Sequence, residues 1–243
     1  MATETRIPAA IPRKAEGKEA PTGSGHQRTR ANELRINEIF FSLQGESTRV
    51  GLPTVFVRLT GCPLRCGYCD TAYAFHEGST RQIDDVMAEV GLHPTRYVCV
   101  TGGEPLAQRN CLVLLEKLCD AGYSVSLETS GAIDIAEVDA RVSRIVDVKT
   151  PGSGESDKNR WENLDLISPH DEIKFVITSE ADFLWAAAIV REQGLAGKCT
   201  VLFSPSFGEV GPEQLAGWIL RDSLPVRMQL QLHKILWGEK RGV

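Results

Sequence analysis

Three cysteines stand close together in the first third of the sequence. Cys62, Cys66 and Cys69 form a C-x3-C-x2-C run with a proline and a glycine between them. On a loop, this spacing lets three thiolates converge on one small inorganic centre, where four thiolates usually complete a zinc or iron–sulfur site. Three protein ligands leave one metal position open to another ligand. The run therefore favours an open iron–sulfur site; a structural zinc site completed by His76 and three ordinary buried cysteines are the alternatives.

Cysteine usage and composition limit the class of protein. The chain has 243 residues, seven cysteines and a net charge of -5. An odd number of cysteines cannot all pair in disulfides, and clustered cysteines in a reducing compartment more often bind metal. The acidic charge argues against a non-specific nucleic-acid binder, and no apolar run is long enough to span a membrane. We expect a soluble, cytoplasmic protein with no nucleic-acid or membrane partner.

The first 31 residues differ from the rest of the chain. They contain no Leu, Val, Phe, Tyr, Trp or Cys, and prolines and glycines interrupt them. Such a segment cannot bury enough apolar area to offset the entropy of ordering it. It also lacks the apolar stretch of a secretory signal. We predict a disordered N-terminal tail over residues 1–31 and one domain over residues 32–243.

Strand and helix patterns alternate from Leu34 onward. An alternation of strands and helices indicates a parallel sheet covered by helices. Five helices are too few for a complete eight-unit barrel, so we expect an α/β fold, a partial (β/α) TIM-like barrel with mostly parallel strands. The strand candidates are Arg35–Phe41, Thr54–Leu59, Tyr97–Thr101, Ser124–Glu128, Arg144–Val148, Glu172–Ile177, Thr200–Phe203 and Met228–Leu232. The helix candidates are Gln82–Val90, Leu106–Ala121, Ala136–Val142, Ala181–Glu192 and Pro212–Arg221.

The residues capable of chemistry follow the carboxyl ends of these strands. Parallel α/β sheets bind their ligands at that edge. The cysteine run follows the second strand, and a Gly-Gly-Glu stretch, residues 102–104, follows the third. Thr129–Gly131, Lys149 and Ser204–Pro205 follow later strands in the same way. We therefore expect these segments to surround one site.

The cysteine run resembles that of the radical S-adenosylmethionine (SAM) enzymes. The second hallmark of that family, Gly102-Gly103-Glu104-Pro105 after a strand, follows about thirty residues later. The resemblance implies a partial barrel of the radical SAM type and a [4Fe-4S] cluster on Cys62, Cys66 and Cys69. It also implies SAM as the ligand of the fourth iron. The chemistry would belong to the cluster and SAM, with no further catalytic residue.

Further segments resemble the 7-carboxy-7-deazaguanine synthases among these enzymes. The resemblance runs from about Ile36 to the C-terminus, through residues 40–47, 56–62, 69–71, 128–131, 147–149, 171–176 and 231–234. It implies conversion of 6-carboxy-5,6,7,8-tetrahydropterin to 7-carboxy-7-deazaguanine with release of ammonia, a step of queuosine biosynthesis that requires Mg2+. The reduced cluster would cleave SAM to a radical that takes hydrogen from C6 of the pterin, and SAM would be regenerated.

The resemblance also implies roles for individual residues. For SAM it implies contacts from Tyr68, Gly103, Glu128, Ser130, Asp147, Val148, Lys149, Ser204, Pro205, Ser206 and Phe207. For the substrate it implies contacts from Leu43, Gln44, Gly45, Arg58, Thr101 and the C-terminal Val243. Thr71 matches the Mg2+ ligand, and Asp70 could assist it. His233 and Lys234, near the last predicted strand, could also meet the substrate.

The protein is also expected to have partners other than SAM and the cluster. The resemblance implies a small-molecule pterin substrate and a homodimer, and an electron donor such as a flavodoxin fits the chemistry. Cys99, Cys111, Cys119 and Cys199 do not cluster in sequence, so we expect them to be core residues. A glycyl-radical-enzyme activase, which acts on a protein, and a non-enzymatic zinc-binding module remain the alternatives.

Overall fold

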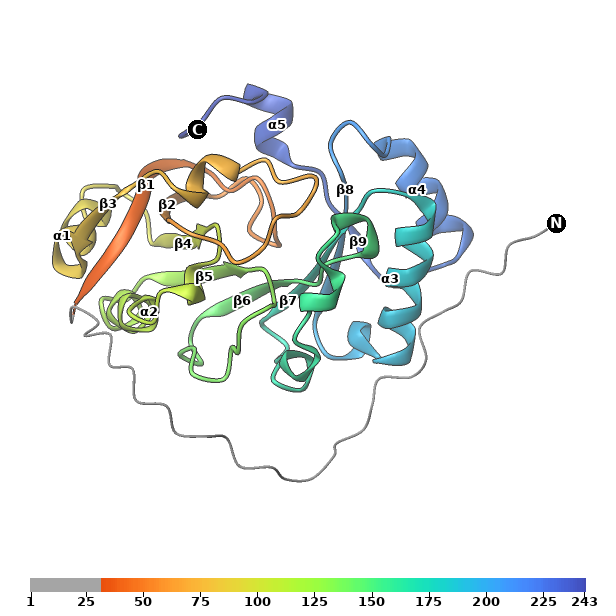
Figure 1. Cartoon of the computed structure of the whole chain (residues 1–243), viewed down its shortest axis with the longest axis horizontal. Coiled ribbons are helices and arrows are strands. Elements are labelled where there is room, and N and C mark those ends of the chain that lie inside the picture. Colours follow the sequence, from red (N-terminus) through yellow and green to blue (C-terminus); the bar gives the residue numbers. More distant parts are fainter. Residues whose placement is uncertain (1–31) are drawn as a thin grey trace. The chain divides into compact units, whose positions relative to one another are not determined.

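A computed structural model describes residues 32–243 (Figure 1). The predicted tail, residues 1–31, lies outside the described residues. The strands of the described part form one sheet in the order β3-β1-β2-β4-β5-β6-β7-β8-β9, in which β2 and β4 to β9 run parallel and β1 runs antiparallel to its neighbours. The strands are β1 (Glu33–Leu43), β2 (Pro53–Leu59), β3 (Ser79–Gln82), β4 (Tyr97–Gly102), β5 (Ser124–Thr129), β6 (Ser143–Asp147), β7 (Glu172–Ile177), β8 (Thr200–Pro205) and β9 (Arg227–Met228).

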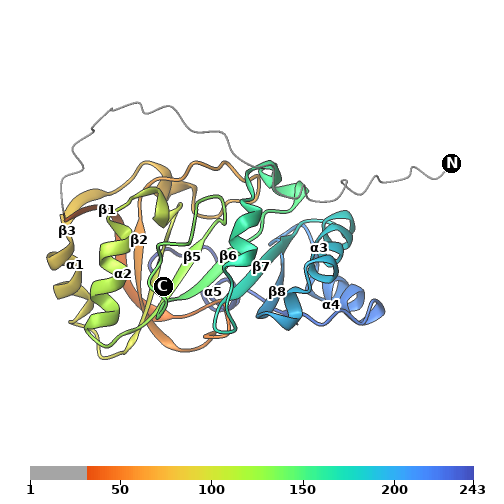
Figure 2. The ribbon, with the colours of Figure 1, turned by 90° about the horizontal axis from the view of Figure 1, so that it is seen from below.

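Helices cover the outside of the curved sheet. The helices α1 and α2 lie next to one half of the sheet, and α3 and α4 lie next to the other half (Figures 1 and 2). The α-helices are α1 (Ile83–Val90), α2 (Cys111–Asp120), α3 (Glu180–Glu192), α4 (Pro212–Arg221) and α5 (Leu232–Trp237). Short 3-10 helices occupy several connections: Ala72–Phe75, Pro105–Ala107, Pro151–Ser153, Ser156–Lys158, Trp161–Asp165 and Leu195–Gly197.

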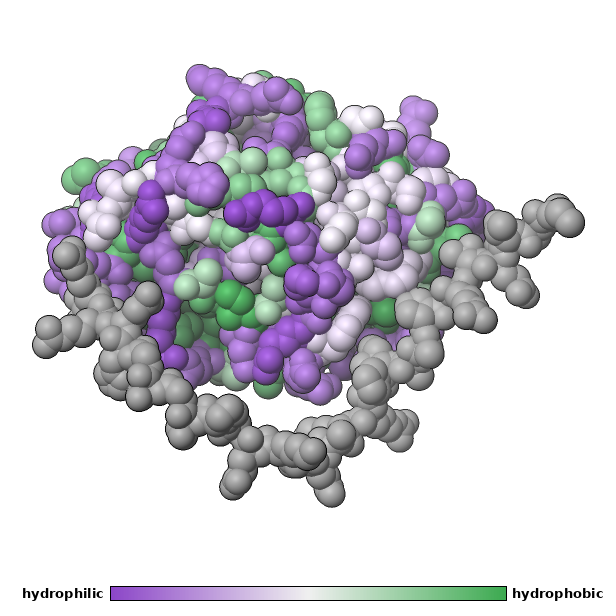
Figure 3. Space-filling view, viewed as in Figure 1, coloured by the Kyte–Doolittle hydropathy of each residue, from purple (hydrophilic) through white to green (hydrophobic). Residues whose placement is uncertain are grey.

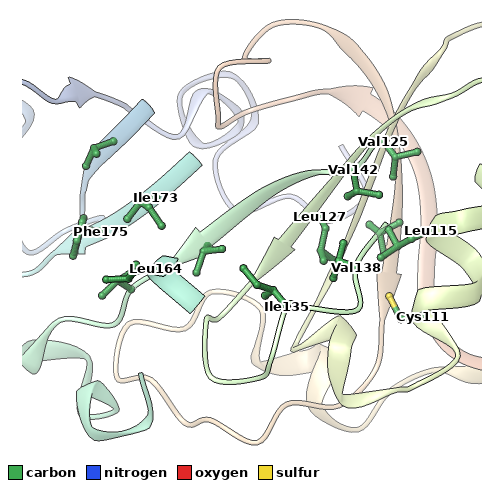
Figure 4. Close-up of a cluster of buried hydrophobic side chains, with 14 of the residues drawn as sticks. Cys111, Leu115, Val125, Leu127, Ile135, Val138, Val142, Leu164, Ile173 and Phe175 are labelled. Atoms are coloured by element: carbon green, nitrogen blue, oxygen red, sulfur yellow. The ribbon is translucent and has the colours of Figure 1, made fainter. Parts of the chain in front are cut away.

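The hydrophobic core lies between the sheet and these helices. Side chains of α2, β5 and the segment that follows β5 gather in it, among them Leu115, Leu127 and Ile135, which are fully buried (Figure 4). The strands from β2 onward are rich in Val, Ile, Leu and Phe, as parallel strands covered on both faces must be. Cys99 and Cys111 are fully buried, so the expectation of core thiols is confirmed for these two.

Most of the predicted elements are present. The strand Glu172–Ile177 and the helix Pro212–Arg221 have the predicted bounds. The predicted helix Leu106–Ala121 is shorter, because Pro105–Ala107 forms a separate 3-10 turn and α2 begins only at Cys111.

Two predicted elements are wrong. The segment Ala136–Val142 forms turns instead of a helix. Asp134 and Asp139 accept hydrogen bonds from backbone N–H groups two residues further on, at 2.9 Å each, and such local bonds compete with a helix. The predicted strand Met228–Leu232 ends at Met228, because Leu232 already begins α5. His233 and Lys234 therefore lie on a helix.

Gly102 and Gly103 lie where the end of β4 meets the start of the cysteine loop. A Cβ on Gly102 would lie 2.4 Å from a backbone oxygen at the end of β2. A Cβ on Gly103 would lie 2.3 Å from the carbonyl oxygen of Gly61 and 2.7 Å from the Cβ of Cys62. Without these side chains the backbones approach closely, and the N–H of Glu104 donates to the Gly61 carbonyl at 2.8 Å. The glycines therefore set the distance between β4 and the cysteines.

Glu104 joins the end of β4 to the end of β5. Its fully buried carboxylate accepts hydrogen bonds from the Thr129 hydroxyl at 2.9 Å and from the N–H and hydroxyl of Ser130 at 2.7 and 2.5 Å. It also accepts the N–H of Leu106 at 2.9 Å. A buried carboxylate is stable only when donors satisfy it in this way. The third residue of the Gly-Gly-Glu stretch thus positions two strand ends.

Hydrogen bonds bridge the open sheet between the loop after β1 and the segment before α5. The N–H of Leu232 donates to the Gly45 carbonyl at 3.0 Å, and the Gln229 side-chain amide donates to the Ser47 carbonyl at 3.1 Å. A Cβ on Gly45 would lie 2.2 Å from Nδ1 of His233, so this glycine allows α5 to approach the loop. Side-chain and backbone bonds here replace the strand pairing of a closed barrel.

Polar side chains cover much of the face shown in Figure 3, and apolar residues form small patches among them. Within residues 32–243, no helix is both long and apolar enough to cross a membrane.

We predict that Gly103→Ala destabilises the protein by about 1–3 kcal/mol, the usual cost of overpacking. The added methyl group would force the Gly61 and Cys62 backbone away from β4. Urea denaturation measures the free energy of unfolding. Gly197→Ala is the matched control, because a Cβ at Gly197 meets nothing within 4 Å. Equal stability of the two variants would contradict the close contact at Gly103.

Candidate active site

A cavity of about 540 Å3 opens at the carboxyl ends of the strands. Its wall includes residues at or just beyond the ends of β2, β4, β5, β6, β7 and β8, together with the loop after β1 and the segment at the start of α5. Its volume lies in the range of small-molecule and cofactor sites. The predicted meeting of the strand ends at one site is therefore present in the structure.

All three cysteines of the run line this cavity. Cys62, Cys66 and Cys69 are half-buried and carry free thiols. The loop that bears them is held from outside, because the N–H of Gly67 donates to the Ser153 carbonyl at 3.0 Å. Burial raises the pKa of each thiol. A metal that binds the thiolates would offset this, since metal binding releases the proton.

The cysteines fit a cluster better than a single ion. Among residues 32–243 no three His, Cys, Asp or Glu side chains are arranged to hold one metal ion. In a [4Fe-4S] cluster each thiolate binds a different iron, so the three thiols need only face a common space. His76, the alternative zinc ligand, is exposed and does not line the cavity.

A polar wall with unsatisfied atoms lies beside the cysteine loop. Nζ of Lys149 is 2.8 Å from Oδ2 of Asp147 and 5.8 Å from the ring centroid of Tyr68. Burial lowers the pKa of Lys149, but the charge and hydrogen bond of Asp147, together with the nearby Cys66 and Cys62, more than offset this, so the pKa is raised and the ammonium persists. Oδ1 of Asp147 and the Tyr68 hydroxyl are buried and, within the described residues, have no hydrogen-bond partner. This wall can accept a polar ligand such as SAM.

A partly buried ion pair also lines the cavity. Nζ of Lys174 contacts Oε2 of Glu46, and the Gln231 amide donates to Oε1 of Glu46 at 2.8 Å. Burial raises the pKa of Glu46, but the charge and hydrogen bond of Lys174 outweigh it, so the pKa is lowered. Burial lowers the pKa of Lys174, but the charges of Glu46, Asp147 and Glu128 together with the hydrogen bond to Glu46 more than compensate, so the pKa is raised. Both groups therefore stay ionised near neutral pH.

Glu128 has different surroundings. Its Oε1 accepts the Gln44 amide at 3.3 Å, and its Oε2 accepts the Thr101 hydroxyl at 2.9 Å. Burial raises the pKa of Glu128, and the like charge of Glu46 raises it further. The hydrogen bonds link Glu128, a predicted SAM contact, to two predicted substrate contacts.

Arg58 and Thr71 already have protein partners. Nε of Arg58 is 2.7 Å from Oε1 of Glu38, and its guanidinium lies 5.7 Å from the ring centroid of Phe40. The Thr71 hydroxyl donates to Asp70 at 2.8 Å. Both residues line the cavity, so the remaining Arg58 donors and the Thr71 oxygen can meet a ligand there.

Most of the predicted site residues line the cavity. These are Gln44, Arg58, Cys62, Cys66, Tyr68, Cys69, Thr71, Thr101, Gly103, Glu128, Ser130, Asp147, Lys149, Ser204, Pro205, Ser206 and Phe207. His233, Lys234 and Asp70 line it as well. The individual binding roles stay predictions, because a shared wall does not show which ligand each residue contacts.

Four predicted site residues do not line the cavity. Val148 is 4% exposed and belongs to the hydrophobic core, and Leu43 pairs with Pro53 at the end of β1. Gly45 packs against His233, so it acts on the position of α5. Val243 is not among the lining residues, although Glu239 of the same segment lines the cavity and a Cβ on Gly242 would lie 3.9 Å from Oε2 of Glu38.

The cavity is also lined by Glu46, Lys174 and Gln231, which were not predicted as site residues. For Lys174 a signal exists, because residues two apart on a strand share a face. Glu172, Lys174 and Val176 share one face of an otherwise apolar strand, and charged residues in a buried strand indicate a polar interior. The pairing of Glu46 with Lys174 spans 128 positions and follows only from the fold.

Comparisons with known proteins agree with this site. Residues 56–215 match the sequence model of the Radical SAM superfamily. The chain is 48% identical over 214 residues to the 7-carboxy-7-deazaguanine synthase of Chlorobaculum tepidum, a match that covers 86% of this chain and 97% of the relative. It is 47% identical over 226 residues to the synthase of Koribacter versatilis, with 86% and 100% covered.

A solved structure supports the fold. The crystal structure of QueE from Escherichia coli matches with a TM-score of 0.66 and 24% identity, and the match covers 83% of this chain and 95% of that one. The prediction of a mostly parallel α/β partial barrel of the radical SAM type is therefore confirmed. The chain belongs to the radical SAM superfamily and, within it, to the family of the 7-carboxy-7-deazaguanine synthases.

Proposed function

We propose that this protein converts 6-carboxy-5,6,7,8-tetrahydropterin to 7-carboxy-7-deazaguanine with release of ammonia, in queuosine or related 7-deazapurine biosynthesis. One observation carries the proposal: the three cysteines and the polar strand ends share the wall of a single cavity in a chain of this family. When bound, the [4Fe-4S] cluster and SAM supply the radical chemistry; the protein binds, orients and shields.

Different parts of the cavity wall would bind the cluster, SAM and the pterin. Cys62, Cys66 and Cys69 would hold the cluster, and the Asp147–Lys149 wall next to Tyr68 would hold SAM. The unsatisfied Oδ1 of Asp147 supports this, because a ligand N–H or O–H would complete its hydrogen bonding. The other polar residues then remain for the pterin.

In this scheme the substrate carboxylate has two cationic partners, the Arg58 guanidinium and a Mg2+ ion. Arg58 offers the guanidinium N–H groups that Glu38 does not use. Thr71 would bind Mg2+ through its hydroxyl oxygen, with Asp70 beside it and the substrate carboxylate as another ligand. Hard oxygen ligands of this kind suit Mg2+. Fixing the carboxylate at one end fixes where C6 of the pterin stands, and such orientation accounts for a large part of a rate enhancement.

Partners beyond the substrate belong to the proposal as well. A homodimer and a flavodoxin-like electron donor are proposed from the resemblance, and a cytoplasmic location from the free thiols and a cluster that needs reducing conditions. The functional domain proposed here is residues 32–243.

The direct test is incubation of the reconstituted, reduced enzyme with SAM, Mg2+ and the carboxytetrahydropterin under anaerobic conditions. We expect 7-carboxy-7-deazaguanine to accumulate while SAM is not consumed in proportion. If no deazapurine forms, and SAM is cleaved only when a partner protein is added, the enzyme is an activase and the proposal is wrong.

Cys66→Ala is expected to abolish cluster binding and SAM cleavage, because two protein ligands remain. Iron content after anaerobic reconstitution and SAM cleavage with dithionite measure the two effects. Cys119→Ala is the control, because this half-buried thiol lies outside the cavity. The Cys119→Ala protein should bind as much iron as the wild type. SAM cleavage in Cys66→Ala at the wild-type rate would contradict the ligand assignment.

Thr71→Ala is expected to keep cluster and SAM binding but to raise the Mg2+ concentration for half-maximal activity by about 10-fold or more, as loss of a partner at a metal site usually does. Product formation over a Mg2+ titration measures it. Thr80→Ala, an exposed threonine on β3, serves as the control. An unchanged Mg2+ response in Thr71→Ala rejects the metal role.

A further inference from the structure

The loop after β1, residues 44–52, reaches the cavity from the end of the sheet opposite the cysteine loop. It joins Leu43 to Pro53, which pair where β1 ends and β2 begins. The cavity opens at the carboxyl ends of the parallel strands, yet Gln44 and Glu46 of this loop line it. The loop therefore enters the interior of the sheet from the amino ends of the strands.

Two side chains of the loop contact β7 at positions two residues apart. Glu46 pairs with Lys174, and Thr48 binds Glu172, the first residue of β7. The N–H of Thr48 donates to Oε2 of Glu172 at 3.0 Å, and its hydroxyl donates to Oε1 at 2.5 Å. Residues two apart on a strand share a face, so Glu172 and Lys174 point to the same side of the sheet. The loop thus follows β7 in the opposite direction, with residue 48 at position 172 and residue 46 at position 174.

The carboxylate of Glu172 makes this register specific. Glu172 is 2% exposed, and a buried carboxylate is stable only when donors satisfy it. Thr48 provides two donors from one residue, which bind both carboxylate oxygens. Burial lowers the pKa of the nearby Arg49, and the charge of Glu172 acts against this shift, so a cation also lies close to the carboxylate. A loop displaced by one residue would lose the Thr48 donors, and an unsatisfied buried acceptor is costly.

Ser47, between the two contacts with β7, has an uncommon backbone conformation. Its φ is 66°, in the left-handed region that residues with a side chain rarely adopt. Its carbonyl accepts the Gln229 amide at 3.1 Å, and its hydroxyl accepts the N–H of Arg49 at 3.1 Å. The Arg49 guanidinium in turn donates to the carbonyls of Ser124 and Val125 at 2.9 and 3.3 Å. Such a conformation persists only where the surrounding contacts hold it, so the loop depends on its attachments.

We propose that Glu172 is a positioning residue, which sets the register of the loop after β1 along β7 and thereby places Gln44 and Glu46 in the cavity. The inference rests on the proposed function, because Gln44 is a predicted substrate contact. Glu172 does not line the cavity, so it acts on the pterin through the loop. Without its carboxylate the Thr48 end of the loop loses its attachment, and relaxation at Ser47 moves Glu46 and Gln44 away from the pterin.

The test compares Glu172→Ala with Glu172→Gln on the anaerobic, oxidised holoenzyme with SAM bound, which cannot turn over. Alanine removes both acceptors, whereas glutamine keeps one oxygen that can accept from Thr48. We expect the Kd of the carboxytetrahydropterin to rise about 10-fold or more in Glu172→Ala and to stay within about 3-fold of the wild type in Glu172→Gln. The Kd of SAM should be unchanged in both variants.

Thr48→Val gives a second measurement from the other side of the contact. Thr48 is exposed, so the substitution removes the hydroxyl donor without opening the core. Because the Thr48 N–H remains, we expect a smaller rise in the pterin Kd, about 3-fold. An unchanged pterin Kd in both Thr48→Val and Glu172→Ala overturns the inference.

Hydrogen exchange reports the register of the loop without any substrate. The N–H groups of Gln44 and Gly51 donate within the loop, to the carbonyls of Leu52 and Gln44 at 2.8 and 2.7 Å. Exchange over residues 44–52 should be about 10-fold faster in Glu172→Ala and close to the wild-type rate in Glu172→Gln, because local opening exposes these bonds. Unchanged exchange in Glu172→Ala overturns the inference.

Asp171→Asn is the matched control for lost stability. Asp171 is the neighbouring carboxylate, is 1% exposed, pairs with Arg144 and does not line the cavity. This variant should keep the wild-type pterin Kd and loop exchange. An equal loss of pterin affinity in Asp171→Asn, or an equal loss of SAM affinity in Glu172→Ala, overturns the positioning role. If the wild type binds no pterin while the exchange responds as expected, the proposed function fails and the attachment of the loop by Glu172 stands.

Discussion

The close backbone contact between the end of β4 and the start of the cysteine loop is the constraint on which the site depends. It exists because Gly103 has no Cβ where Gly61 and Cys62 stand. The carboxylate of Glu104, the next residue, accepts hydrogen bonds from Ser130 at the end of β5. Three consecutive residues of one strand end thus fix the distance from β4 to the cysteines on one side and to β5 on the other. These glycines first allow close backbone contact within the chain. The space for SAM beside them is a consequence of that contact.

Charge compensation is the second requirement of this cavity. Isolated buried charges are strongly unfavourable, and pairs are tolerated when further hydrogen bonds satisfy them. The Lys174–Glu46 pair is completed by Gln231, and the Lys149–Asp147 pair leaves one carboxylate oxygen without a partner. A closed network is a rigid wall, whereas an incomplete one marks where a ligand can bind. The unsatisfied Asp147 oxygen therefore indicates where a polar ligand can bind.

Local patterns allowed much of the site to be predicted. Cys62, Cys66 and Cys69 form a motif within eight residues, and the polar residues at strand ends meet because parallel strands end at one edge. Contacts distant in sequence were not predictable in this way. Neither the approach of His233 to Gly45 nor the pairing of Lys174 with Glu46 leaves a local pattern. The helix expected over residues 136–142 failed because aspartate side chains bond to nearby N–H groups more readily than a short helix forms.

The C-terminal segment shows how an incomplete barrel can still enclose its site. The apolar and polar residues after Met228 alternate as in a strand, yet β9 has only two residues. The chain turns because the N–H of Leu232 bonds to Gly45, which redirects it into α5. Lys234 on α5 then lies 3.4 Å from Asp70, next to the last cysteine of the run. One segment therefore contacts both the loop after β1 and the cysteine loop. The loop after β1 and the cysteine loop are therefore both held by α5, one through the Leu232–Gly45 hydrogen bond and the other through the Lys234–Asp70 ion pair.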